Sequence, residues 1–316
     1  MSSIHDYPPY PNHLVAAQQF DRFTLERLFA QAKEMEGISV SMDGCDLLRR
    51  RIIATLFYEP STRTRLSFET AIMQLGGRVI STENAKEFSS AAKGETIEDT
   101  VRVIGKYAKA IIIRHHETGA VLKAARVSPV PIINAGDGVG QHPTQALLDL
   151  YTIQKCFGQI DGLTIAMVGD LANGRTVRSL CHMLSRFKVN KVYFVAPDVV
   201  AMKDDIKKHL TEHGVCFADQ PDISQIVGET DVFYWTRIQK ERFGDRVEDY
   251  ELARGKYIAD AAFAATLKSG AIIMHPLPRV DEIKTDLDPL PCAKYFEQAG
   301  NGVPVRMAIL ADMLKP

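Results

Sequence analysis

The chain has 316 residues, enough for two domains of about 150 residues each. Hydrophobic residues make up 46% and charged residues 24%, a composition that is typical of a globular protein and excludes wholesale disorder. The net charge of −1 excludes a generally basic surface that would coat nucleic acid. Any anion must therefore be bound by a local group of cations.

The cysteines and the first residues indicate the compartment. Five cysteines are scattered along the chain without any C-x-x-C pair: Cys45, Cys156, Cys181, Cys216 and Cys292. This pattern is typical of a reducing compartment, with no disulfide framework and no zinc ribbon. The opening MSSIHDYPPYPNHL is polar and does not resemble a signal peptide, and no apolar run approaches the roughly 18 residues that span a bilayer. We predict a cytoplasmic protein with neither a membrane nor a nucleic acid as partner.

Apolar runs that fit buried strands recur along the chain, with helical patterns between them. The runs are residues 52–59, 78–82, 110–114, 130–136, 163–170, 191–198, 232–235 and 271–278. Among the helical patterns, Phe68, Ile72 and Leu75 share one face at i, i+4 and i+7. Alternating strands and helices of this length predict an α/β fold of parallel sheets flanked by helices.

The chain divides near QHPTQALLDLYTIQK, which reads as one helix with Pro143 in its first turn, where proline is tolerated. We predict a first domain over 1–142, a linking helix over 143–157 and a second domain over 158–292. A C-terminal helix over 293–316, broken at AGNG, is expected to pack back on the first domain. The predicted fold thus has two domains, each a parallel sheet flanked by helices, joined by long interdomain helices.

The densest polar cluster lies in FYEPSTRTRLSFE, where a strand gives way to a helix. Ser61 is the expected N-cap, so the amides that follow point out of the helix toward a site that favours an anion. The hydroxyls of Ser61, Thr62 and Thr64 add further donors. The competing interpretation is an ordinary capped helix with solvated charges.

Two arginines in this stretch point in different directions. Arg63 and Arg65 lie about 200° apart around a helix, so both cannot face one ligand. Since a guanidinium offers a bidentate fork suited to phosphate, we assign Arg63 to the ligand and Arg65 to a supporting ion pair.

Other strand ends in the first half also carry polar groups. Arg114 stands where the third strand stops, His142 precedes the linking helix, and Gln145 follows one turn later. Ligands of open parallel sheets bind beyond the carboxyl ends of the strands, so we expect these groups to converge with the first cluster. His142 is suited to donate to a carbonyl oxygen and Gln145 to bind an amide edge, although a simple helix cap is the alternative for His142.

The second half repeats this pattern. MVGDLANGRTVRSL places Arg175 at a turn between strand and helix, and WTRIQKER carries Arg237, Gln239 and Arg242 after a strand. HPLPRVDE follows the last strand, and its prolines hold backbone carbonyls rigidly beside a site. The stretch MVGDLANGRTVRSL resembles a dinucleotide-binding turn but lacks G-x-G-x-x-G, so NAD binding is disfavoured.

No metal or nucleophilic site is evident. His209 and His213 share a helix face at i, i+4, but the segment is polar and lacks a third ligand, so we predict a solvated helix end. Five cations remain for one cleft between two domains, enough for a phosphate and a dicarboxylate: Arg63, Lys93, Arg114, Arg175 and Arg237. The sequence thus predicts direct transfer by positioning and stabilisation of an oxyanion, without metal or cofactor.

The order of these motifs resembles the aspartate/ornithine carbamoyltransferase family over nearly the whole chain. The shared motifs are STRTRLSFE, KGET, RHHETG, NAGDGVGQHPTQ, MVGD, GRTV, TRIQKER and HPLPRVDEI. Ornithine enzymes characteristically carry H-C-L-P and an S-M-G loop, where this chain has His275-Pro276-Leu277-Pro278 and Thr236-Arg237-Ile238-Gln239. The second half therefore resembles the aspartate branch. The alternatives are an enzyme that acts on another amino acid such as ornithine, and a catalytically silent relative.

The resemblance implies a role for each matched residue. The phosphate of carbamoyl phosphate would be held by Ser61, Thr62, Arg63 and Thr64, and its carbonyl oxygen polarised by Thr64, Arg114 and His142. Its NH2 group would be bound by Gln145 and the backbone carbonyls of Pro276 and Leu277. L-Aspartate would be bound by Arg175 at its α-carboxylate, by Arg237 and Gln239 at its β-carboxylate, and further by Lys93 and Leu277. Glu59 would position Arg175 and Arg242 when the domains close.

The resemblance also implies the reaction and the partners. The α-amine of L-aspartate would attack the carbonyl, giving N-carbamoyl-L-aspartate and phosphate for pyrimidine synthesis, with Arg63, Thr64, Arg114, His142 and Lys93 as catalytic residues. Ser89 and Lys93 would enter the site of a neighbouring subunit, so the resemblance implies a homotrimer with shared active sites. Regulatory chains and allosteric control are further expectations that the sequence itself does not decide.

Overall fold

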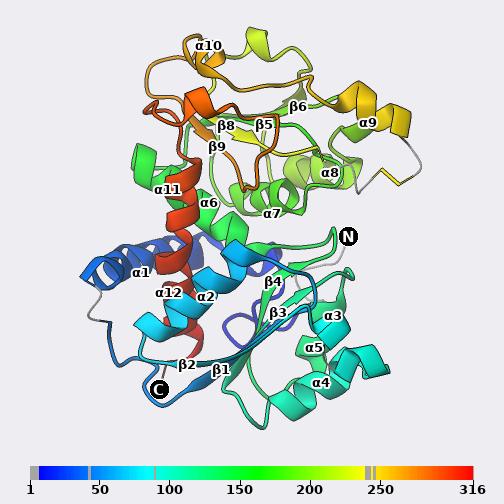
Figure 1. The fold of residues 1–316 in the computed structure, drawn as a ribbon. Coiled ribbons are helices and arrows are strands. Elements are labelled where there is room, and N and C mark those ends of the chain that lie inside the picture. The colour runs from blue at the N-terminus through cyan, green and yellow to red at the C-terminus, as the bar shows by residue number, and fades with distance from the viewer. Residues whose placement is uncertain (1–6, 42–43, 89, 239–242, 245–246, 316) are drawn as a thin grey trace. The chain divides into compact units, whose positions relative to one another are not determined.

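The structure is a computed structural model that describes residues 7–41, 44–88, 90–238, 243–244 and 247–315 (Figure 1). Its contacts divide the chain into two units. One comprises Met1–Tyr151 with Asn301–Pro316, and the other comprises Thr152–Gly300. The domain limits expected from the sequence stay a prediction.

The first unit is built on a four-stranded parallel sheet. Its strands are β1 (Ile52–Phe57), β2 (Arg78–Glu83), β3 (Ala110–His115) and β4 (Ile132–Asp137), in the order β2-β1-β3-β4. The central strands are apolar runs without alternation because both faces of this sheet are covered by helices. Every residue of β3 and β4 is buried.

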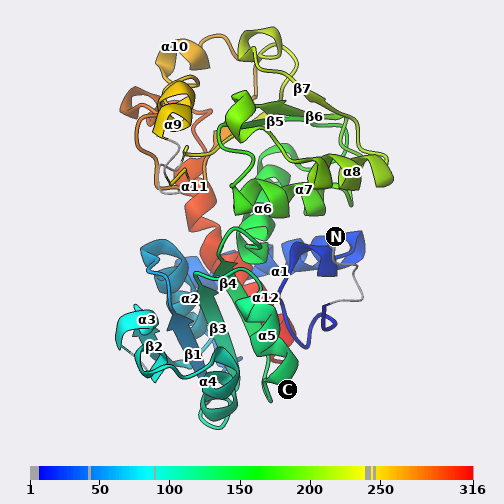
Figure 2. The ribbon, with the colours of Figure 1, turned by 90° about the vertical axis from the view of Figure 1, so that its right-hand side faces the viewer.

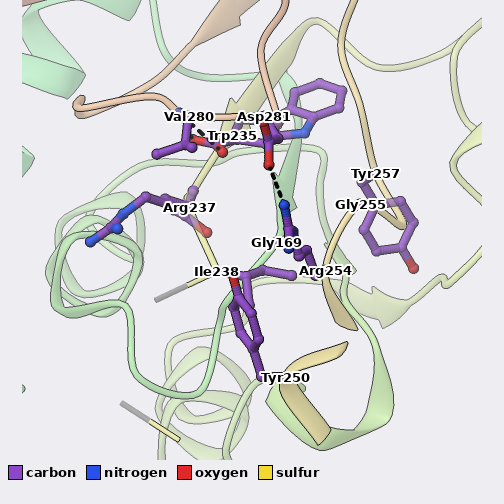
Figure 3. Close-up of a pocket in the computed structure, with 12 residues that line it drawn as sticks. Gly169, Trp235, Arg237, Ile238, Tyr250, Arg254, Gly255, Tyr257, Val280 and Asp281 are labelled. Atoms are coloured by element: carbon purple, nitrogen blue, oxygen red, sulfur yellow. Dashed lines mark hydrogen bonds and ion pairs between the residues drawn. The ribbon is translucent and has the colours of Figure 1, made fainter. Parts of the chain in front are cut away.

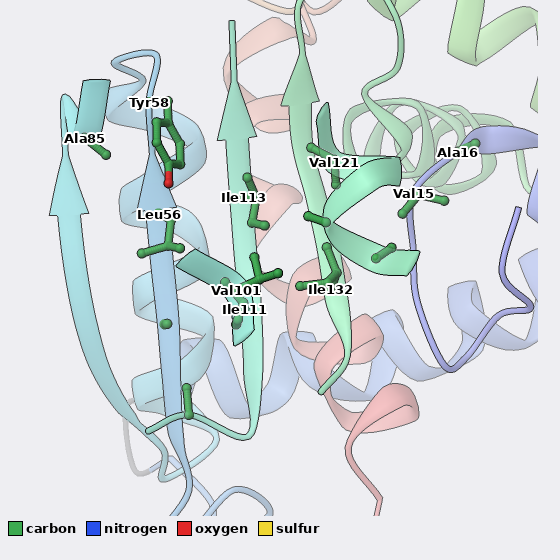
Figure 4. Packing of buried hydrophobic residues seen from close by; sticks show 14 residues of the cluster. Val15, Ala16, Leu56, Tyr58, Ala85, Val101, Ile111, Ile113, Val121 and Ile132 are labelled. Carbon is green, nitrogen blue, oxygen red and sulfur yellow. The ribbon is translucent and has the colours of Figure 1, made fainter. Parts of the chain in front are cut away.

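Helices cover both faces of this sheet (Figures 1 and 2). One face carries α1 (Arg22–Ser41), α2 (Thr62–Gln74) and α12 (Gly302–Met313), and the other carries α4 (Ile97–Ile104) and α5 (Ala120–Val127). A short α3 (Ala85–Phe88) follows β2. Figure 4 shows the apolar layer beneath α4 and α5, where Leu56, Ile111, Ile113 and Ile132 meet Val121.

The predicted helix after the first strand is confirmed. Phe68, Ile72 and Leu75 are fully buried, as their shared face requires. Arg306 of α12, itself 2% exposed, lies over the Phe68 ring at 4.9 Å from its centroid. Contacts of this kind fix α2 in place, and its N-terminus then presents the predicted anion site.

The second unit is built on a five-stranded parallel sheet. Its strands are β5 (Thr164–Val168), β6 (Lys191–Val195), β7 (Phe217–Asp219), β8 (Val232–Trp235) and β9 (Ile272–Met274), in the order β7-β6-β5-β8-β9. The helices are α7 (Arg175–Leu184), α8 (Asp204–Glu212), α9 (Val247–Ala253), α10 (Ala261–Ala264) and α11 (Tyr295–Gly300). Trp235 and Phe233 pack edge-on against Phe263, with ring centroids 5.1 and 5.4 Å apart.

The strand β7 is missing from the sequence prediction. It has three residues at the sheet edge, two of them half-buried and one exposed, so it leaves no apolar run in the sequence. Short 3-10 turns complete the described secondary structure: η2 (Ala17–Gln19), η3 (Ser90–Lys93), η4 (Asp198–Val200), η5 (Ile223–Gln225) and η7 (Thr285–Leu287).

Two long helical segments carry the chain from one unit to the other. The helix α6 (Pro143–Phe157) begins at the predicted proline, and the predicted break in the last helical segment separates α11 from α12 at Asn301. The expected α/β fold with two parallel sheets flanked by helices is confirmed. Of the helices in the described ranges, none has the length and apolarity to cross a membrane.

Candidate active site

The first part of the site is the corner between β1 and α2. Ser61 is the N-cap, with an extended backbone (φ −161°, ψ 98°), and its carbonyl accepts the first helical hydrogen bond from the Arg65 amide at 3.0 Å. The amides of residues 62–64 therefore precede the helical ladder. Within the described part of the chain the Ser61 side chain makes no capping hydrogen bond, so its hydroxyl is available to a ligand.

The side chains at this corner differ in exposure. Thr62 and Arg63 reach solvent, whereas Thr64 is 6% exposed. The predicted supporting role of Arg65 is confirmed by its ion pairs, at 3.4 Å with Glu69 and 2.9 Å with Glu83. Arg63 is thus the exposed guanidinium of this corner, and Arg65 ties α2 to the sheet.

Arg114 stands beside this corner because β3 pairs with β1. Its carbonyl accepts a hydrogen bond from the Tyr58 amide at 2.8 Å, and its side chain is buried. One guanidinium nitrogen donates to Glu59 Oε1 at 2.7 Å and another reaches the Ala135 carbonyl at 3.4 Å. Glu59 thus pairs with Arg114 in this structure, and its expected role in positioning Arg175 and Arg242 stays a prediction.

The loop before His142 is organised by one buried carboxylate. Asp137 accepts hydrogen bonds from the amides of Gln141 at 2.7 Å and Gly119 at 2.8 Å. Gly138 follows with φ +48°, and a Cβ there would lie 2.5 Å from Thr118 Oγ1. Only glycine suits this turn, which returns the chain to the carboxyl edge of the sheet.

His142 and Gln145 begin the helix that leaves this loop. His142 is 4% exposed, and its carbonyl accepts from the Gln145 amide at 3.1 Å. The Gln145 side chain donates to Asp149 one turn later at 2.8 Å, which orients its amide. The ends of β1, β3 and β4 thus bring Arg63, Arg114 and His142 to one sheet edge.

In the second unit, too, candidate site residues follow the carboxyl ends of neighbouring strands. Arg175, Arg237 and Pro276 follow β5, β8 and β9, which are neighbours in the sheet. Gly169 at the end of β5 has φ +111°, and a Cβ there would lie 2.2 Å from the Thr236 carbonyl. This close approach fixes the chain immediately before Arg237.

Arg175 is the first residue of α7, after the N-cap Gly174. The turn before it is closed by Asp170, whose carboxylate accepts from the Asn173 amide at 3.0 Å. Arg175 therefore projects from a helix start at the carboxyl end of β5. Pro276 and Leu277 lie in the loop after β9, and Leu277 adopts a left-handed backbone with φ +54°.

A small pocket of 90 Å³ lies beside Arg237 (Figure 3). Its lining includes Trp235, Ile238, Tyr250, Val280 and the ion pair of Arg254 with Asp281, whose atoms are 3.2 Å apart. Figure 3 shows the Arg237 side chain extending away from this ion pair. The guanidinium of Arg237 is therefore not the partner of Asp281 here.

Three predicted site residues, Ser89, Gln239 and Arg242, lie outside the described residues. Lys93, expected to serve a neighbouring subunit, is exposed in η3. No three His, Cys, Asp or Glu side chains within the described ranges are grouped as metal ligands.

The prediction that both histidines of the segment 209–213 lie in a solvated helix end is wrong for His209. Its side chain is 7% exposed, and Nε2 lies 2.9 Å from the Ser185 hydroxyl. Burial lowers the pKa of His209 to about 4, with the neighbouring His213 adding to the effect. The polar sequence around His209 concealed this burial, because the covering residues come from α7.

Sequence comparison identifies the family. Two profiles match, the carbamoyl-P binding domain of aspartate/ornithine carbamoyltransferase over residues 12–155 and the Asp/Orn binding domain over residues 161–313. The chain is 56% identical over 301 residues to a chloroplastic aspartate carbamoyltransferase of Arabidopsis thaliana, covering 95% of this chain and 77% of the relative. It is 48% identical to an aspartate carbamoyltransferase catalytic subunit of Methanocaldococcus jannaschii, covering 96% and 98%.

Solved structures agree with these matches. Aspartate transcarbamoylase of Trypanosoma cruzi in complex with carbamoyl phosphate and aspartate superposes with a TM-score of 0.90 at 39% identity, covering 97% of this chain and 99% of that one. The same enzyme in complex with N-(phosphonacetyl)-L-aspartic acid also superposes with a TM-score of 0.90, covering 98% of this chain and 99% of that one.

The predicted cytoplasmic location is wrong. The plant relatives that are 54% to 56% identical to this chain are chloroplastic enzymes, and this finding contradicts the prediction. The absence of a disulfide pattern does not separate two reducing compartments, so cysteine spacing could not make this distinction. From the two profiles and these relatives, the chain belongs to the aspartate/ornithine carbamoyltransferase family, among its aspartate carbamoyltransferases.

Proposed function

We propose that this aspartate carbamoyltransferase uses two sets of residues, one in each unit, to transfer the carbamoyl group of carbamoyl phosphate to the α-amine of L-aspartate. The products are N-carbamoyl-L-aspartate and phosphate, in de novo pyrimidine biosynthesis. The observation that carries the proposal is the corner at Ser61–Thr64. It combines helix amides, hydroxyls and the exposed Arg63, with Arg114 held beside it by Glu59.

Carbamoyl phosphate would be held by the first unit. The amides of residues 62–64 and the fork of Arg63 suit the phosphate oxygens, since a helix N-terminus favours an anion. Thr64, Arg114 and His142 are buried donors suited to a carbonyl oxygen. Gln145, with the backbone carbonyls of Pro276 and Leu277, would bind the NH2 group.

L-Aspartate would be held by the second unit. Arg175 would bind the α-carboxylate and Arg237, with Gln239, the β-carboxylate. Arg175 starts a helix and Arg237 follows a strand, so both guanidiniums are held on short, anchored segments. Lys93 and Ser89 would join from a neighbouring subunit, and Glu59 and Arg242 would act in domain closure.

The chemistry follows from these groups. The neutral α-amine attacks the carbonyl carbon, a C–N bond forms, and negative charge develops on the carbonyl oxygen. Thr64, Arg114 and His142 stabilise that charge because donors aimed at a developing oxyanion lower the barrier. The C–O bond to phosphate then breaks, and the departing phosphate accepts the proton of the amine.

A homotrimer with shared sites is supported by apolar groups that stay exposed on the first unit. Leu66 and Met73 of α2 are 48% and 59% exposed, and Ile80 of the edge strand β2 is 40% exposed. Such residues suit a surface that another subunit covers. Light scattering on the purified chain should give a mass of three chains, and Leu66→Asp should shift it toward one.

Regulatory chains and allosteric control form a separate part of the proposal. Several relatives are catalytic subunits, which supports a partner chain. A sigmoidal dependence of rate on aspartate concentration, altered by a nucleotide, would support control. A hyperbolic curve that no nucleotide changes, in the presence of candidate regulatory chains, would contradict it.

The alternative acceptor is ornithine, and a carbamoylation assay separates the two. The purified chain is given carbamoyl phosphate with either L-aspartate or L-ornithine, and the products are measured by mass spectrometry. We expect N-carbamoyl-L-aspartate in the first reaction and no citrulline in the second. Citrulline alone would overturn the proposed acceptor, and no product with either would overturn activity altogether.

A further inference from the structure

A buried imidazole supports the loop after β9. His275 is 1% exposed and directly precedes Pro276 and Leu277, the residues whose carbonyls are proposed to meet the carbamoyl group. Its own amide donates to Gln298 Oε1 at 2.9 Å, and the Gln298 side chain is also 1% exposed. His275 is thus anchored to α11 by its backbone, while its ring contacts the loop.

The contacts of the ring determine its tautomer. The Leu277 amide donates to His275 Nδ1 at 2.8 Å, so Nδ1 must present a lone pair. The proton of the neutral ring is then on Nε2, which lies 2.9 Å from Glu282 Oε1. The same carboxylate lies 3.2 and 3.3 Å from the Val280 amide. The Glu282 carboxylate therefore accepts from the far side of the loop at Val280 and lies beside the ring.

The bond to Nδ1 also fixes the direction of a carbonyl. The Pro276–Leu277 peptide is trans, so its N–H and its C=O point in opposite directions across one plane. Holding the Leu277 N–H against His275 therefore turns the Pro276 carbonyl away from the ring. Leu277 has φ +54°, which leucine adopts only when its surroundings impose it.

We propose that His275, held in the Nε2–H tautomer by the Leu277 amide, is a positioning residue that aims the Pro276 carbonyl at the NH2 group of carbamoyl phosphate. The inference rests on the proposed role of that carbonyl. A merely structural histidine would fill space in the core and contribute stability alone. The two interpretations differ in which substrate constant a substitution changes.

The test compares two substitutions of His275 in the full chain. His275→Leu removes the acceptor, whereas His275→Asn keeps an oxygen that accepts from the amide two residues on, as in an Asx-turn. We expect the KM for carbamoyl phosphate to rise about tenfold in His275→Leu, the effect of one hydrogen bond. In His275→Asn it should stay within about threefold of the wild type.

Inorganic phosphate serves as the probe that lacks a carbamoyl group. Its inhibition constant should be unchanged in His275→Leu, because the Pro276 carbonyl would not contact it. His182→Leu is the matched control, a buried imidazole of the same unit whose ring packs edge-on against His209 with centroids 4.3 Å apart. It should lower the melting temperature and leave the KM for carbamoyl phosphate unchanged.

A spectrum of the 15N-histidine-labelled chain reports the tautomer directly. The proposal requires the His275 proton on Nε2 and a bare Nδ1, and a proton on Nδ1 would overturn it. An unchanged KM in His275→Leu, or an equal weakening of phosphate and carbamoyl phosphate, would also overturn it. Failure of the proposed function can be told apart from failure of this inference, since the wild-type chain would then form no N-carbamoyl-L-aspartate.

Discussion

The two units hold their functional residues at a sheet edge by different means. In each, three neighbouring parallel strands end at one sheet edge, β1, β3 and β4 in the first and β5, β8 and β9 in the second. In the first unit, the guanidinium nearest the helix corner is held by a side-chain ion pair, Arg114 with Glu59, although the loop before His142 also relies on Gly138. In the second, backbone devices such as Gly169 and the left-handed Leu277 do so.

This difference predicts that the two units respond differently to substitution. Substitutions that remove a charge should impair the first unit without unfolding it, since its loops keep their backbone contacts. Substitutions that alter backbone freedom should impair the second unit and destabilise it together. Variants of both units test this contrast.

Arg63→Ala should give the largest loss of activity. We expect kcat/KM to fall by about 10²–10³-fold, because a donor aimed at the reacting groups is lost. The melting temperature should stay unchanged, since Arg63 is exposed. Arg102→Ala, which removes an exposed arginine paired with Asp99 at 3.1 Å, is the control and should keep full activity. Near-normal turnover of Arg63→Ala would contradict the assigned role.

Gly169→Ala should damage the second unit through its backbone. The new Cβ would lie 2.2 Å from the Thr236 carbonyl, so β5 and β8 must separate beside Arg237. We expect a loss of about 3 kcal/mol in the free energy of unfolding and a rise in the KM for aspartate. Gly228→Ala, where no atom lies within 4 Å, is the matched control. Equal melting temperatures for both variants would refute this account.

Glu59→Gln should weaken catalysis more moderately. The Arg114 guanidinium would lose a charged partner at 2.7 Å and become less well oriented. We expect kcat to fall about tenfold with little change in stability, consistent with one charge-assisted hydrogen bond. Glu26→Gln, in an exposed ion pair with Arg22, is the control for the loss of a carboxylate. A kcat equal to that of the wild type would show that Glu59 does not orient Arg114 for the reaction.

His209 should make the second unit sensitive to acid. Burial holds the pKa of His209 at about 4, below its usual 6.5, so the folded protein keeps the neutral ring. Stability is then complete above pH 6.5 and declines as pH falls toward 4, since the unfolded chain takes up the proton first. The contribution is about 1–3 kcal/mol.

Urea unfolding between pH 7.5 and 4.5 measures this effect. His209→Phe should unfold with a smaller dependence on pH than the wild type, whereas Lys208→Gln, an exposed neighbour, should not change the dependence. An identical pH dependence in His209→Phe and the wild type would show that His209 does not cause it.

Much of the fold could be predicted from the sequence, because periodic patterns report burial directly. The runs at 52–59 and 232–235, the proline at the start of α6 and the break before α12 all carry local signals. The strand β7 could not be predicted, since three partly exposed residues carry no such signal. The burial of His209 is set by α7, which is distant in sequence.

The residues that hold the candidate site in place were harder to predict than the residues proposed to bind the substrates. Arg63, Arg114 and Arg175 stand at strand ends that the sequence reveals. The pairing of Glu59 with Arg114 depends on which strands are neighbours, and this follows only from the sheet order. Asp137 and His275 act through backbone amides, so their residue types alone do not indicate what they hold.

The division of the substrates between the two sets of residues is tested most directly by one crystal structure. The full chain would be crystallised with N-(phosphonacetyl)-L-aspartic acid, the compound bound by the T. cruzi relative. We predict the phosphonate on the amides of residues 62–64 with Arg63, and the two carboxylates on Arg175 and Arg237. A phosphonate bound at Arg175, or carboxylates bound at the Ser61–Thr64 corner, would contradict the account.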